Sequence, residues 1–387
     1  MRFQRKSKKT ALSKRNQIGY HRANFQQHLQ EPAMKLALVF GLVAASLFSV
    51  VCQAGSISLG QAANYNMFVK ENFSASSSDT EGAAAIGGNL QVNGGYDFGY
   101  VNSSAAATVT VGGNVVKKGE GHLNVYDGAG NTRLGELVYG GSYSVTGGGV
   151  GVAGTSKAPA ALDFNSAFTR LNALSDQLAA KTTPAVDVNR NTQDGVLVFT
   201  PAKVTTDNVY IFKITQDDLN TFHTIRVDNS NISKDALVVF NVSNPNGTPA
   251  KNWTPQATCA AGKTDCLSLT QVRYEVGDLN SNSAAIANHV LFNFNGINDL
   301  RIASSVYGSI LAPKAAISTD WGVIWGQVMA KSWSGNQQVN WAPLDIPPGG
   351  NNSVNAPSPV ALLLLVPALF SLRRRTTLQA LPQLQTV

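Results

Sequence analysis

The sequence predicts a mainly β protein, an irregular right-handed β-solenoid with one long amphipathic helix packed along it. Three observations lead to this prediction. Glycine pairs recur in similar surroundings, and their second glycines, Gly88, Gly113 and Gly141, follow one another at nearly regular intervals. Apolar residues recur with helical spacing in one long segment, between Ala160 and Ala180. Small and β-branched residues with little charge favour strands joined by tight turns.

Each glycine pair follows an apolar residue and precedes Asn or Ser, after which apolar positions alternate. The three units are IGGNLQV from Ile86, VGGNVVKKG from Val111 and VYGGSYSVTGGG from Val138. Glycine allows positive φ and close approach of two backbones, and the alternation predicts a strand with one buried face. Such units stack as coils of a solenoid, because each buries its inner face on the next. The alternative is a β-sandwich with glycine-rich hairpins.

The predicted helix lies between Pro159, which suits a helix start, and Pro184, which follows its end. Its apolar residues are Phe164, Phe168, Leu171, Leu174 and Leu178. An apolar stripe of this kind must cover something. A groove along the solenoid is the expected partner.

Strands are expected to resume after the helix. The apolar runs are residues 195–201, 209–215, 223–230, 235–243 and 289–296. Two of them contain VLVF and LVVF, which are apolar on both faces and predict strands covered on both sides. Two further glycine-led runs begin at Gly308 and Gly326, one expected solenoid turn apart, and predict successive coils. The solenoid domain is expected to span residues 55–346.

Residues 1–54 predict export. Residues 1–33 carry eight Lys or Arg and one acid, so their net charge of 8 − 1 = +7 equals that of the whole chain. Residues 34–54 read as a secretory signal peptide, with small residues placed for cleavage before Gly55. This predicts the Sec export machinery as a partner. The basic extension has two interpretations. Either Met34 is the true start of the chain, or the signal peptide has an unusually long basic region.

The exported body is mildly acidic. Residues 55–372 hold 18 Lys or Arg and 22 Asp or Glu, a net charge of 18 − 22 = −4. This balance gives no electrostatic case for nucleic-acid binding. Cys259 and Cys266 are the cysteines that remain after the signal peptide. In an oxidising compartment they are expected to close a small loop as a disulfide, and free thiols are the alternative.

The C-terminus predicts a sorting and anchoring tail. Residues 347–359 form a linker of Pro, Gly and Asn, and residues 360–387 contain a short apolar run and the cluster Arg373, Arg374 and Arg375. Thirteen apolar residues make about 20 Å of helix, short of the ~30 Å hydrocarbon core. The arginines would hold the cytoplasmic side of a membrane.

Two ends of the body resemble the choice-of-anchor A family. The opening motifs are Asn64-Tyr65-Asn66-Met67-Phe68, Asp79-Thr80-Glu81-Gly82 and Ile86-Gly87-Gly88-Asn89; the closing blocks are Tyr307–Pro313 and Gly326–Ser332. The resemblance covers most of residues 59–343. It implies a surface domain carried on various anchors, and some members are matrix-associated. The closing block also resembles bacterial ice-binding solenoids, which lay one long helix along a β-helix.

The tail resembles the PEP-CTERM class of Gram-negative bacteria. Pro357 and Pro359 flank a serine where that class has Pro-Glu-Pro. The resemblance implies an exosortase-like sorting enzyme and a location in the cell envelope or extracellular matrix.

Residues for catalysis are sparse. After the signal peptide the chain has three histidines, His122, His223 and His289, and none has metal-ligand spacing with a second His or Cys. The adjacent acids Asp217 and Asp218 read first as a helix cap. We therefore expect no enzyme, no resident metal and no cofactor. A polysaccharide-active enzyme stays the third hypothesis.

Two acidic motifs have alternative interpretations. Asp79 and Glu81 either hydrogen-bond backbone N–H groups in the first coil or hold a cation or ligand. The segment from Asp127 to Asn131 is either a plain Asx turn or a Ca²⁺-binding turn.

Four of the five tryptophans, Trp321, Trp325, Trp333 and Trp341, fall in one short stretch near the end of the predicted solenoid. If they face solvent they would stack on sugar rings, and if they are buried they would cap the last coil.

Thr108-Val109-Thr110 is the threonine run that an ice-binding face would need. We expect an exported, surface-anchored adhesive protein that associates with extracellular polysaccharide or a matrix protein. A carbohydrate-binding module built on Trp321, Trp325 and Trp333 is the alternative, and ice binding comes behind it.

Overall fold

The computed structural model describes residues 57–347, apart from 102–104, 106, 229, 252–258, 271–272, 277–278 and 281–283. The predicted signal peptide, basic extension, linker and sorting tail lie outside the described residues. Within the described part of the chain, no helix is long and apolar enough to cross a membrane.

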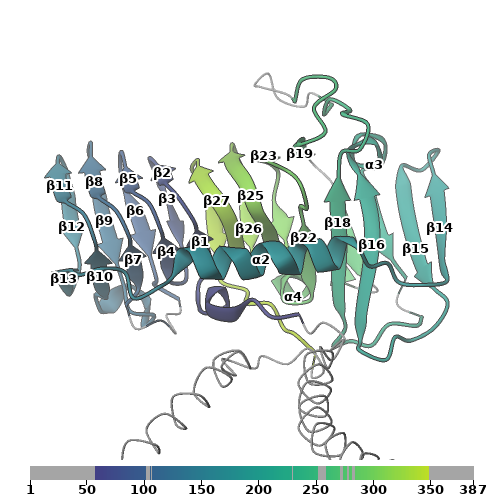
Figure 1. Cartoon of the computed structure of the whole chain (residues 1–387), viewed down its shortest axis with the longest axis horizontal. Coiled ribbons are helices and arrows are strands. Elements are labelled where there is room, and N and C mark those ends of the chain that lie inside the picture. The colour runs from purple at the N-terminus through teal and green to yellow at the C-terminus, as the bar shows by residue number, and fades with distance from the viewer. Residues whose placement is uncertain are drawn as a thin grey trace, which may run out of the picture. The chain divides into compact units, whose positions relative to one another are not determined.

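Each coil of the first half contributes one strand to each of three stacks (Figure 1). Strands of the first stack are β1 (Met67–Val69), β4 (Ala84–Ile86), β7 (Val109–Val111), β10 (Glu136–Tyr139) and β13 (Gly154–Lys157). The second stack holds β2 (Phe73–Ala75), β5 (Leu90–Val92), β8 (Val115–Lys118) and β11 (Tyr143–Thr146). The third holds β3 (Ser78–Thr80), β6 (Tyr96–Phe98), β9 (His122–Val125) and β12 (Gly149–Gly151). Neighbours within each stack pair in parallel.

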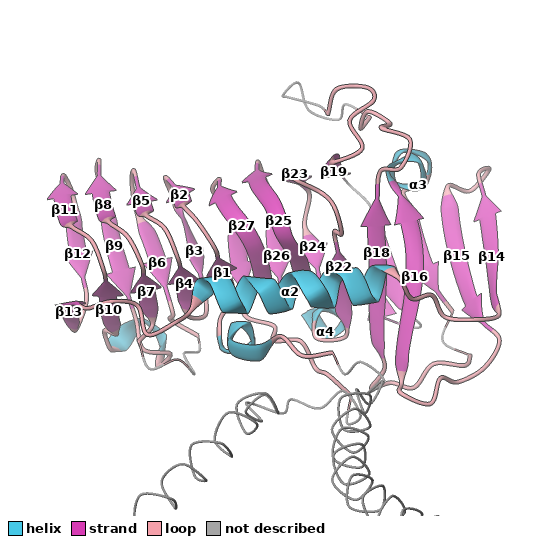
Figure 2. Cartoon of the chain, viewed as in Figure 1, coloured by secondary structure: helices cyan, strands magenta, loops and turns pink. Residues whose placement is uncertain are grey.

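The later part of the chain extends the same stacks. Its strands are β16 (Val209–Thr215), β18 (Leu237–Ser243), β19 (Cys266–Thr270), β22 (Val290–Asn293), β23 (Asp299–Ala303), β24 (Val306–Tyr307), β25 (Ser309–Thr319), β26 (Val323–Trp325), β27 (Val328–Ser334) and β28 (Gln338–Asn340). A separate sheet holds β14 (Val186–Asn191), β15 (Val196–Pro201), β17 (Thr224–Val227), β20 (Arg273–Val276) and β21 (Leu279–Asn280). The helices are η1 (Gly60–Asn64), η2 (Gly130–Thr132), α2 (Phe164–Ala179), α3 (Gln216–Thr221) and α4 (Ala284–Ala287). Figure 2 shows how strongly strands dominate.

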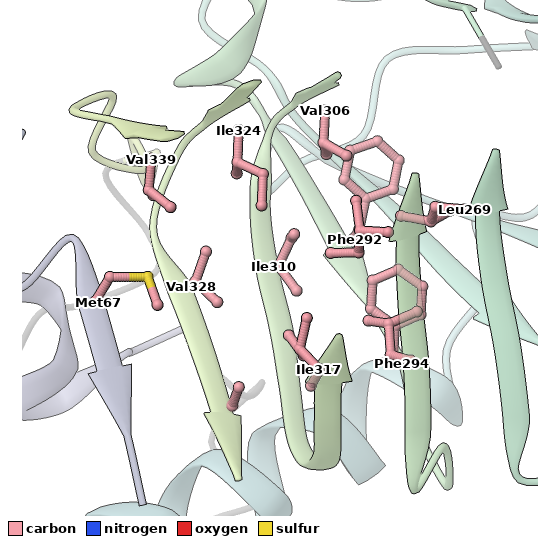
Figure 3. Close-up of a cluster of buried hydrophobic side chains, with 14 of the residues drawn as sticks. Met67, Leu269, Phe292, Phe294, Val306, Ile310, Ile317, Ile324, Val328 and Val339 are labelled. Carbon is pink, nitrogen blue, oxygen red and sulfur yellow. The ribbon is translucent and has the colours of Figure 1, made fainter. Parts of the chain in front are cut away.

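The two ends of the described chain meet in the middle of the solenoid. Met67 of β1 pairs with Ala84 on one side and with Val328 of β27 on the other. The core continues across this junction, where Met67, Val328 and Ile310 pack in one apolar layer (Figure 3). The interpretation of the last coil as the end of the stack is therefore wrong: coils are added on both sides of it. Parallel coils of similar width stack equally well in any order, so the repeat pattern does not reveal the order.

The glycine pairs are in register, as predicted. The Gly113 N–H donates to the Gly88 carbonyl at 2.8 Å, and the Gly141 N–H donates to the Gly113 carbonyl at 2.8 Å. A Cβ on Gly112 would lie 2.3 Å from the carbonyl oxygen of Gly87, so a side chain does not fit between coils. These contacts confirm the predicted stacking.

The asparagine after each glycine pair forms a ladder between coils. The backbone N–H of Asn89 donates to Asn72 Oδ1 at 2.9 Å, and that of Asn114 donates to Asn89 Oδ1 at 2.8 Å. Ser142 continues the ladder with an N–H bond to Asn114 Oδ1 at 2.7 Å. The ladder satisfies backbone donors at a turn where no strand partner is available.

Helix α2 lies along the solenoid, as predicted, and runs from β1 across β25, β22 and β18, which continue the first stack (Figure 1). Asp163 caps its start by accepting a hydrogen bond from the Ser166 N–H at 3.0 Å. The buried stripe is Phe168, Leu171, Leu174 and Leu178. It packs on outward-facing side chains of the strands such as Phe68, whose ring centroid lies 5.5 Å from that of Phe168.

The prediction of strands covered on both sides holds for one of the two runs. Strand β18 is buried from Leu237 to Val242, because one side lines the core and the other contacts α2. In β15, buried and half-buried residues alternate, so only one side is fully covered. The difference arises because α2 ends before it reaches the sheet that contains β15.

Candidate functional site

The third stack forms a seven-stranded parallel sheet in the order β12-β9-β6-β3-β28-β26-β24. Its inward side chains, such as Thr80, Phe98 and Val339, are buried. Its outward side chains form ranks, because the coils pair in register. We name this outward surface the aromatic-acidic face. Its residues include Asp79, Glu81, Asp97, Asn124, Tyr307, Trp325 and Gln338. All seven are half-buried and reach solvent.

One rank carries acids and amides. Asp79 pairs with Asp97 across β3 and β6, and Asp97 pairs with Asn124 across β6 and β9. The Asn124 side-chain amide donates to Asp97 Oδ1 at 2.8 Å. Asp79 Oδ1 is buried, with no hydrogen-bond partner among the described residues. The rank therefore presents carboxylate and amide groups, and part of their hydrogen-bonding capacity is unused.

Glu81 lies two residues further along the chain and has a structural partner. Its Oε2 accepts a hydrogen bond from the Trp341 backbone N–H at 2.7 Å, and Tyr100 donates to its Oε1 at 3.5 Å. Burial raises the pKa of Glu81, and these two hydrogen bonds lower it. Burial, followed by the charges of Asp79 and Glu81, raises the pKa of Tyr100 to about 12.

Asp79 is the most perturbed acid of the face. Burial, followed by the negative charges of Glu81 and Asp97, raises its pKa to about 6, against the opposing hydrogen bonds of Gln338 and Tyr100. Because the folded-state pKa lies above the unfolded value of 3.8, the folded state favours the protonated carboxyl. Its contribution to stability is present below the unfolded pKa and is lost as pH rises through about 6.

Replacement of Asp79 by Asn is therefore expected to stabilise the fold at about pH 8 and to change little at about pH 4. The expected gain at the higher pH is about 1 kcal/mol, after allowance for the partial solvent exposure of the carboxylate. Urea unfolding of both proteins at the two pH values measures it. An equal effect at both pH values would contradict the assignment of strain to the ionised carboxylate.

The aromatic residues of the face lie further along the same sheet, with β28 between the strand of Asp79 and β26. Tyr307 of β24 and Trp325 of β26 are opposite each other in the ladder. Trp321, in the turn before β26, is 43% exposed. Of the predicted cluster, Trp321 is exposed and Trp325 and Trp341 are half-buried, and Tyr307, which was not among the predicted residues, joins Trp325 on an adjacent coil.

Trp333 does not belong to this surface. It is 1% exposed, and its ring stacks on Phe73 with a centroid distance of 6.2 Å and an interplanar angle of 10°. Its assignment as a ligand-binding residue is therefore wrong, because alternation along β27 points it into the core. Nor does the cluster cap the solenoid, since these coils lie in mid-stack. Trp341 is half-buried against Gly82, where a Cβ would lie 2.6 Å from the indole ring.

Two buried amides of the terminal motifs hold the chain ends together. Asn66 donates to the carbonyls of Gly326 at 2.6 Å and Asn340 at 3.2 Å, and its Oδ1 accepts from the Gly82 N–H at 2.9 Å. Gln327 donates to the carbonyls of Ala63 and Tyr65, each at 2.9 Å. The motif residues at both ends thus join the first coil to the last.

The other positions that the sequence singled out are buried or take part in local hydrogen bonds. Thr108 and Thr110 are 3% and 7% exposed, so this run does not form an ice-binding surface. Asp127 accepts from the Ala129 N–H and pairs with Arg133, as in an Asx turn. Among the described residues, no group of three or more His, Cys, Asp or Glu could hold a metal ion.

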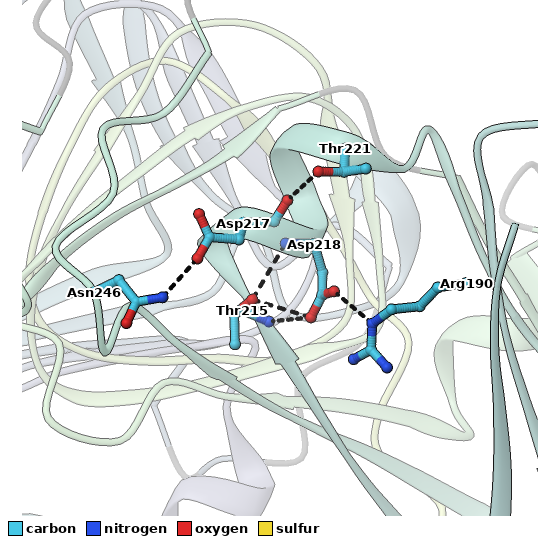
Figure 4. Close-up of polar contacts among 6 residues, drawn as sticks. All are labelled: Arg190, Thr215, Asp217, Asp218, Thr221 and Asn246. Carbon is cyan, nitrogen blue, oxygen red and sulfur yellow. Dashed lines mark hydrogen bonds and ion pairs between the residues drawn. The ribbon is translucent and has the colours of Figure 1, made fainter. Parts of the chain in front are cut away.

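Asp217 and Asp218 begin α3 (Figure 4). Asp218 forms a capping box with Thr215 and lies 3.4 Å from Arg190, while Asp217 accepts a hydrogen bond from Asn246 at 2.9 Å. Asp218 thus caps the helix, as expected from the sequence, whereas Asp217 bonds a neighbouring loop.

The cysteines close a loop at the edge of the second stack. Cys259 and Cys266 form a disulfide with a Cα–Cα distance of 5.5 Å. The loop borders a cavity of about 400 Å³ over the ends of β19, β23, β25 and β27. Its polar lining includes Lys263, Asp299 and Ser318.

Asp97, Asn124 and Tyr307 were missed by sequence reasoning. Asp97 follows Gly88 by nine positions, whereas Asn124 follows Gly113 by eleven. Because the loops between glycine pair and strand differ in length, the spacing does not align the two residues. Alternation alone would have placed each on the outer side of its strand.

The fold defines the class of this protein: a β-solenoid with three strands in each regular coil and a helix along one face. Residues 58–341 match the model of the family described as "Putative Ice-binding-like adhesive domain". The chain belongs to this family. No curated protein matches it.

Solved structures to which the chain is similar include three ice-binding proteins. One, from an Antarctic biological consortium, is 13% identical with a TM-score of 0.32, over 74% of this chain and 89% of that chain. Another, from the Antarctic ascomycete Antarctomyces psychrotrophicus, is 12% identical with a TM-score of 0.30, over 74% and 98%. A glycosylated one from an Arctic yeast is 14% identical with a TM-score of 0.31, over 74% and 94%.

Proposed function

We propose that this protein is an exported surface adhesin whose aromatic-acidic face holds an extracellular polysaccharide. The observation that carries the proposal is the arrangement of solvent-accessible Trp325 and Tyr307 beside the rank that contains Asp79 and Asp97. Aromatic faces pack against the C–H faces of sugar rings, while carboxylates and amides hydrogen-bond the hydroxyls. A repeated rank suits a polymer, because successive coils offer contacts at a constant spacing.

Export and anchoring belong to the same proposal. The signal peptide at residues 34–54 would direct the chain to Sec, and the tail at 360–387 would be processed by an exosortase-like enzyme in a Gram-negative envelope. Residues 347–359 would act as a linker between the anchor and the solenoid. This arrangement would resemble that of the choice-of-anchor A family, in which one surface domain is carried on various anchors.

The test is a glycan array, followed by affinity measurements on the best polysaccharide, with the chain from Gly55 onward. The variant Tyr307→Ala/Trp325→Ala is expected to bind at least about tenfold more weakly, since central aromatic contacts dominate such interfaces. The control Gln91→Ala changes an exposed residue on a different stack and is expected to bind normally. Binding that is unchanged in the double variant would overturn the assignment to this face.

Ice binding is the second candidate, and a different surface favours it. The outward rank of the second stack contains, in register, Ser144, Val116, Gln91, Ser74, Ser334 and Ser318. Val116 and Ser74 are half-buried, and the other four are exposed. A regular surface of mostly small polar side chains suits an ordered water lattice. Thermal hysteresis, measured on the same wild-type chain, decides this: activity without any glycan binding would favour ice over polysaccharide.

A further inference from the structure

The aromatic-acidic face carries negative charge that no basic residue of the described chain offsets. Its acids are Asp79, Glu81 and Asp97. Among the described residues, none of the ion pairs involves these three. Burial and the neighbouring acids raise the pKa of Asp79, and the side chains that oppose this, Gln338 and Tyr100, are uncharged. A positive charge at this face would therefore relieve repulsion among its acids.

Aromatic rings flank these acids within the sheet. One outward rank contains, in order, Trp325, Asn340, Glu81 and Tyr126, because each follows an inward-facing residue at the same level of the stack. Tyr100, which donates to Glu81 Oε1 at 3.5 Å, meets Tyr126 edge to face with ring centroids 6.4 Å apart. All three aromatic residues are half-buried. Such rings suit a cation with C–H surface, because ring faces attract positive charge and pack on C–H groups.

The hydrogen-bonding capacity that stays unused on this face is that of acceptors. Asp79 Oδ1 and Asn340 Oδ1 are buried, and neither has a hydrogen-bond partner among the described residues. Asn340 is 5% exposed and follows the inward-facing Val339, so alternation turns its side chain to the outer side, in register with Trp325. An ammonium group offers three donors and no acceptor, whereas a hydroxyl group offers both. The unused acceptors therefore match an ammonium group better than a hydroxyl group.

The acids and the ring of Trp325 can contact one polymer at the same time. Strand β28 lies between β26, which carries Trp325, and β3, which carries Asp79. Two strand spacings of about 4.8 Å separate β26 from β3, about 10 Å in all. A short run of sugar units spans that distance, so a sugar ring packed on Trp325 can be joined to an amino group at Asp79.

We propose that the aromatic-acidic face selects a polysaccharide with free amino groups, such as a polymer of glucosamine that is not acetylated on nitrogen. This inference rests on the proposed binding of polysaccharide and adds the charge class of the polymer. The protonated amino groups pair with Asp79 and Asp97, while Trp325 and Tyr307 pack on sugar rings. A polymer of uronic acids is disfavoured, because its carboxylates are repelled by those of the face.

Calorimetric titration of the full chain with two hexasaccharides tests the inference. One is a hexamer of glucosamine, and the other is the same hexamer with every amino group acetylated. At about pH 6.5, above the pKa of Asp79 of about 6, most Asp79 carboxyls are ionised and sugar amino groups are still protonated. We expect the free-amine hexamer to bind about tenfold more tightly than the acetylated one. Added salt is expected to reduce this preference.

Two charge-neutralised variants locate the recognition of the amino group. Asp79→Asn/Asp97→Asn removes two carboxylates and keeps the side-chain shape, so it is expected to bind the free-amine hexamer about tenfold more weakly. Asp187→Asn/Asp235→Asn removes the same charge from exposed sites outside the face, and this matched control is expected to bind as the wild type does. Circular dichroism establishes that each variant is folded before it is compared.

Three results would contradict the inference. Equal affinity of the wild type for the two hexamers would overturn it and leave polysaccharide binding itself intact. A preference that persists in folded Asp79→Asn/Asp97→Asn would overturn it as well, because the amino group would then be recognised elsewhere. Binding of neither hexamer would also overturn it, and the glycan array then decides the wider proposal separately.

Discussion

Replacing Asn66 with Ala is expected to lower the free energy of unfolding by about 3 kcal/mol. Asn66 is fully buried and makes hydrogen bonds to Gly82, Gly326 and Asn340. Its removal takes the Asn66 partner from the Gly326 carbonyl and the Gly82 N–H at the junction where the first coil meets the last, while the Asn340 carbonyl keeps its hydrogen bond from the Gly326 N–H. A buried polar group without a partner costs more than a typical hydrogen bond contributes.

Two further variants sharpen this experiment. Asn66→Asp has nearly the same shape but cannot donate, so it is expected to destabilise the fold by a similar amount. Asn93→Ala, in an exposed turn, is the matched control and is expected to change stability by less than about 0.5 kcal/mol. Urea unfolding measures all three. A near-neutral Asn66→Asp would show that the two donated hydrogen bonds do not hold the junction.

Replacing Trp333 with Ala is expected to destabilise the fold by about 4 kcal/mol. The indole lies in the core against Phe73, so truncation would leave a cavity between the first and last coils. Trp321→Ala removes an indole from the same stretch of sequence, but from a site that is 43% exposed. It is expected to change stability by about 0.5 kcal/mol or less.

The comparison separates the two roles of the tryptophan cluster. Thermal unfolding, followed by circular dichroism, is expected to show a much lower Tm for the Trp333 variant than for the Trp321 variant. Equal effects would contradict the placement of Trp333 in the core. Trp333 is packed in mid-stack and does not reach the proposed glycan-binding face. The folded fraction of the Trp333→Ala variant is therefore expected to bind glycan as the wild type does.

The fold was largely predictable because its signals are local. Glycine pairs at Gly88, Gly113 and Gly141 mark coils, since a Cβ there would collide with the neighbouring coil. The stripe from Phe168 to Leu178 marks α2, since a helical period of 3.6 brings those residues to one side. A continuous apolar run predicts two-sided burial for both β15 and β18, but only β18 lies under α2, so this signal is right for one strand of the two.

The candidate site was only partly predictable. Asp79 and Trp325 were singled out by residue type and motif, but Trp333 was placed with them because proximity in sequence does not reveal alternation across a bent strand. Asp97 and Asn124 join Asp79 through strand register, and the loops that set this register vary in length. A distance between side chains on different coils is a property of the stack and has no counterpart in the local pattern.

The sequence by itself determined the coil-forming units, the amphipathic helix and the small-residue turns, because each depends on neighbours a few positions away. Only the tertiary structure decided the order of the coils. It put the first and last coils side by side through Asn66 and Gln327, whose partners lie at the other end of the described chain, and it left β11, β12 and β13 at an open end. The physical reason is that parallel coils of one width present the same hydrogen-bonding edge to any neighbour. Side-chain contacts at specific junctions then select one arrangement.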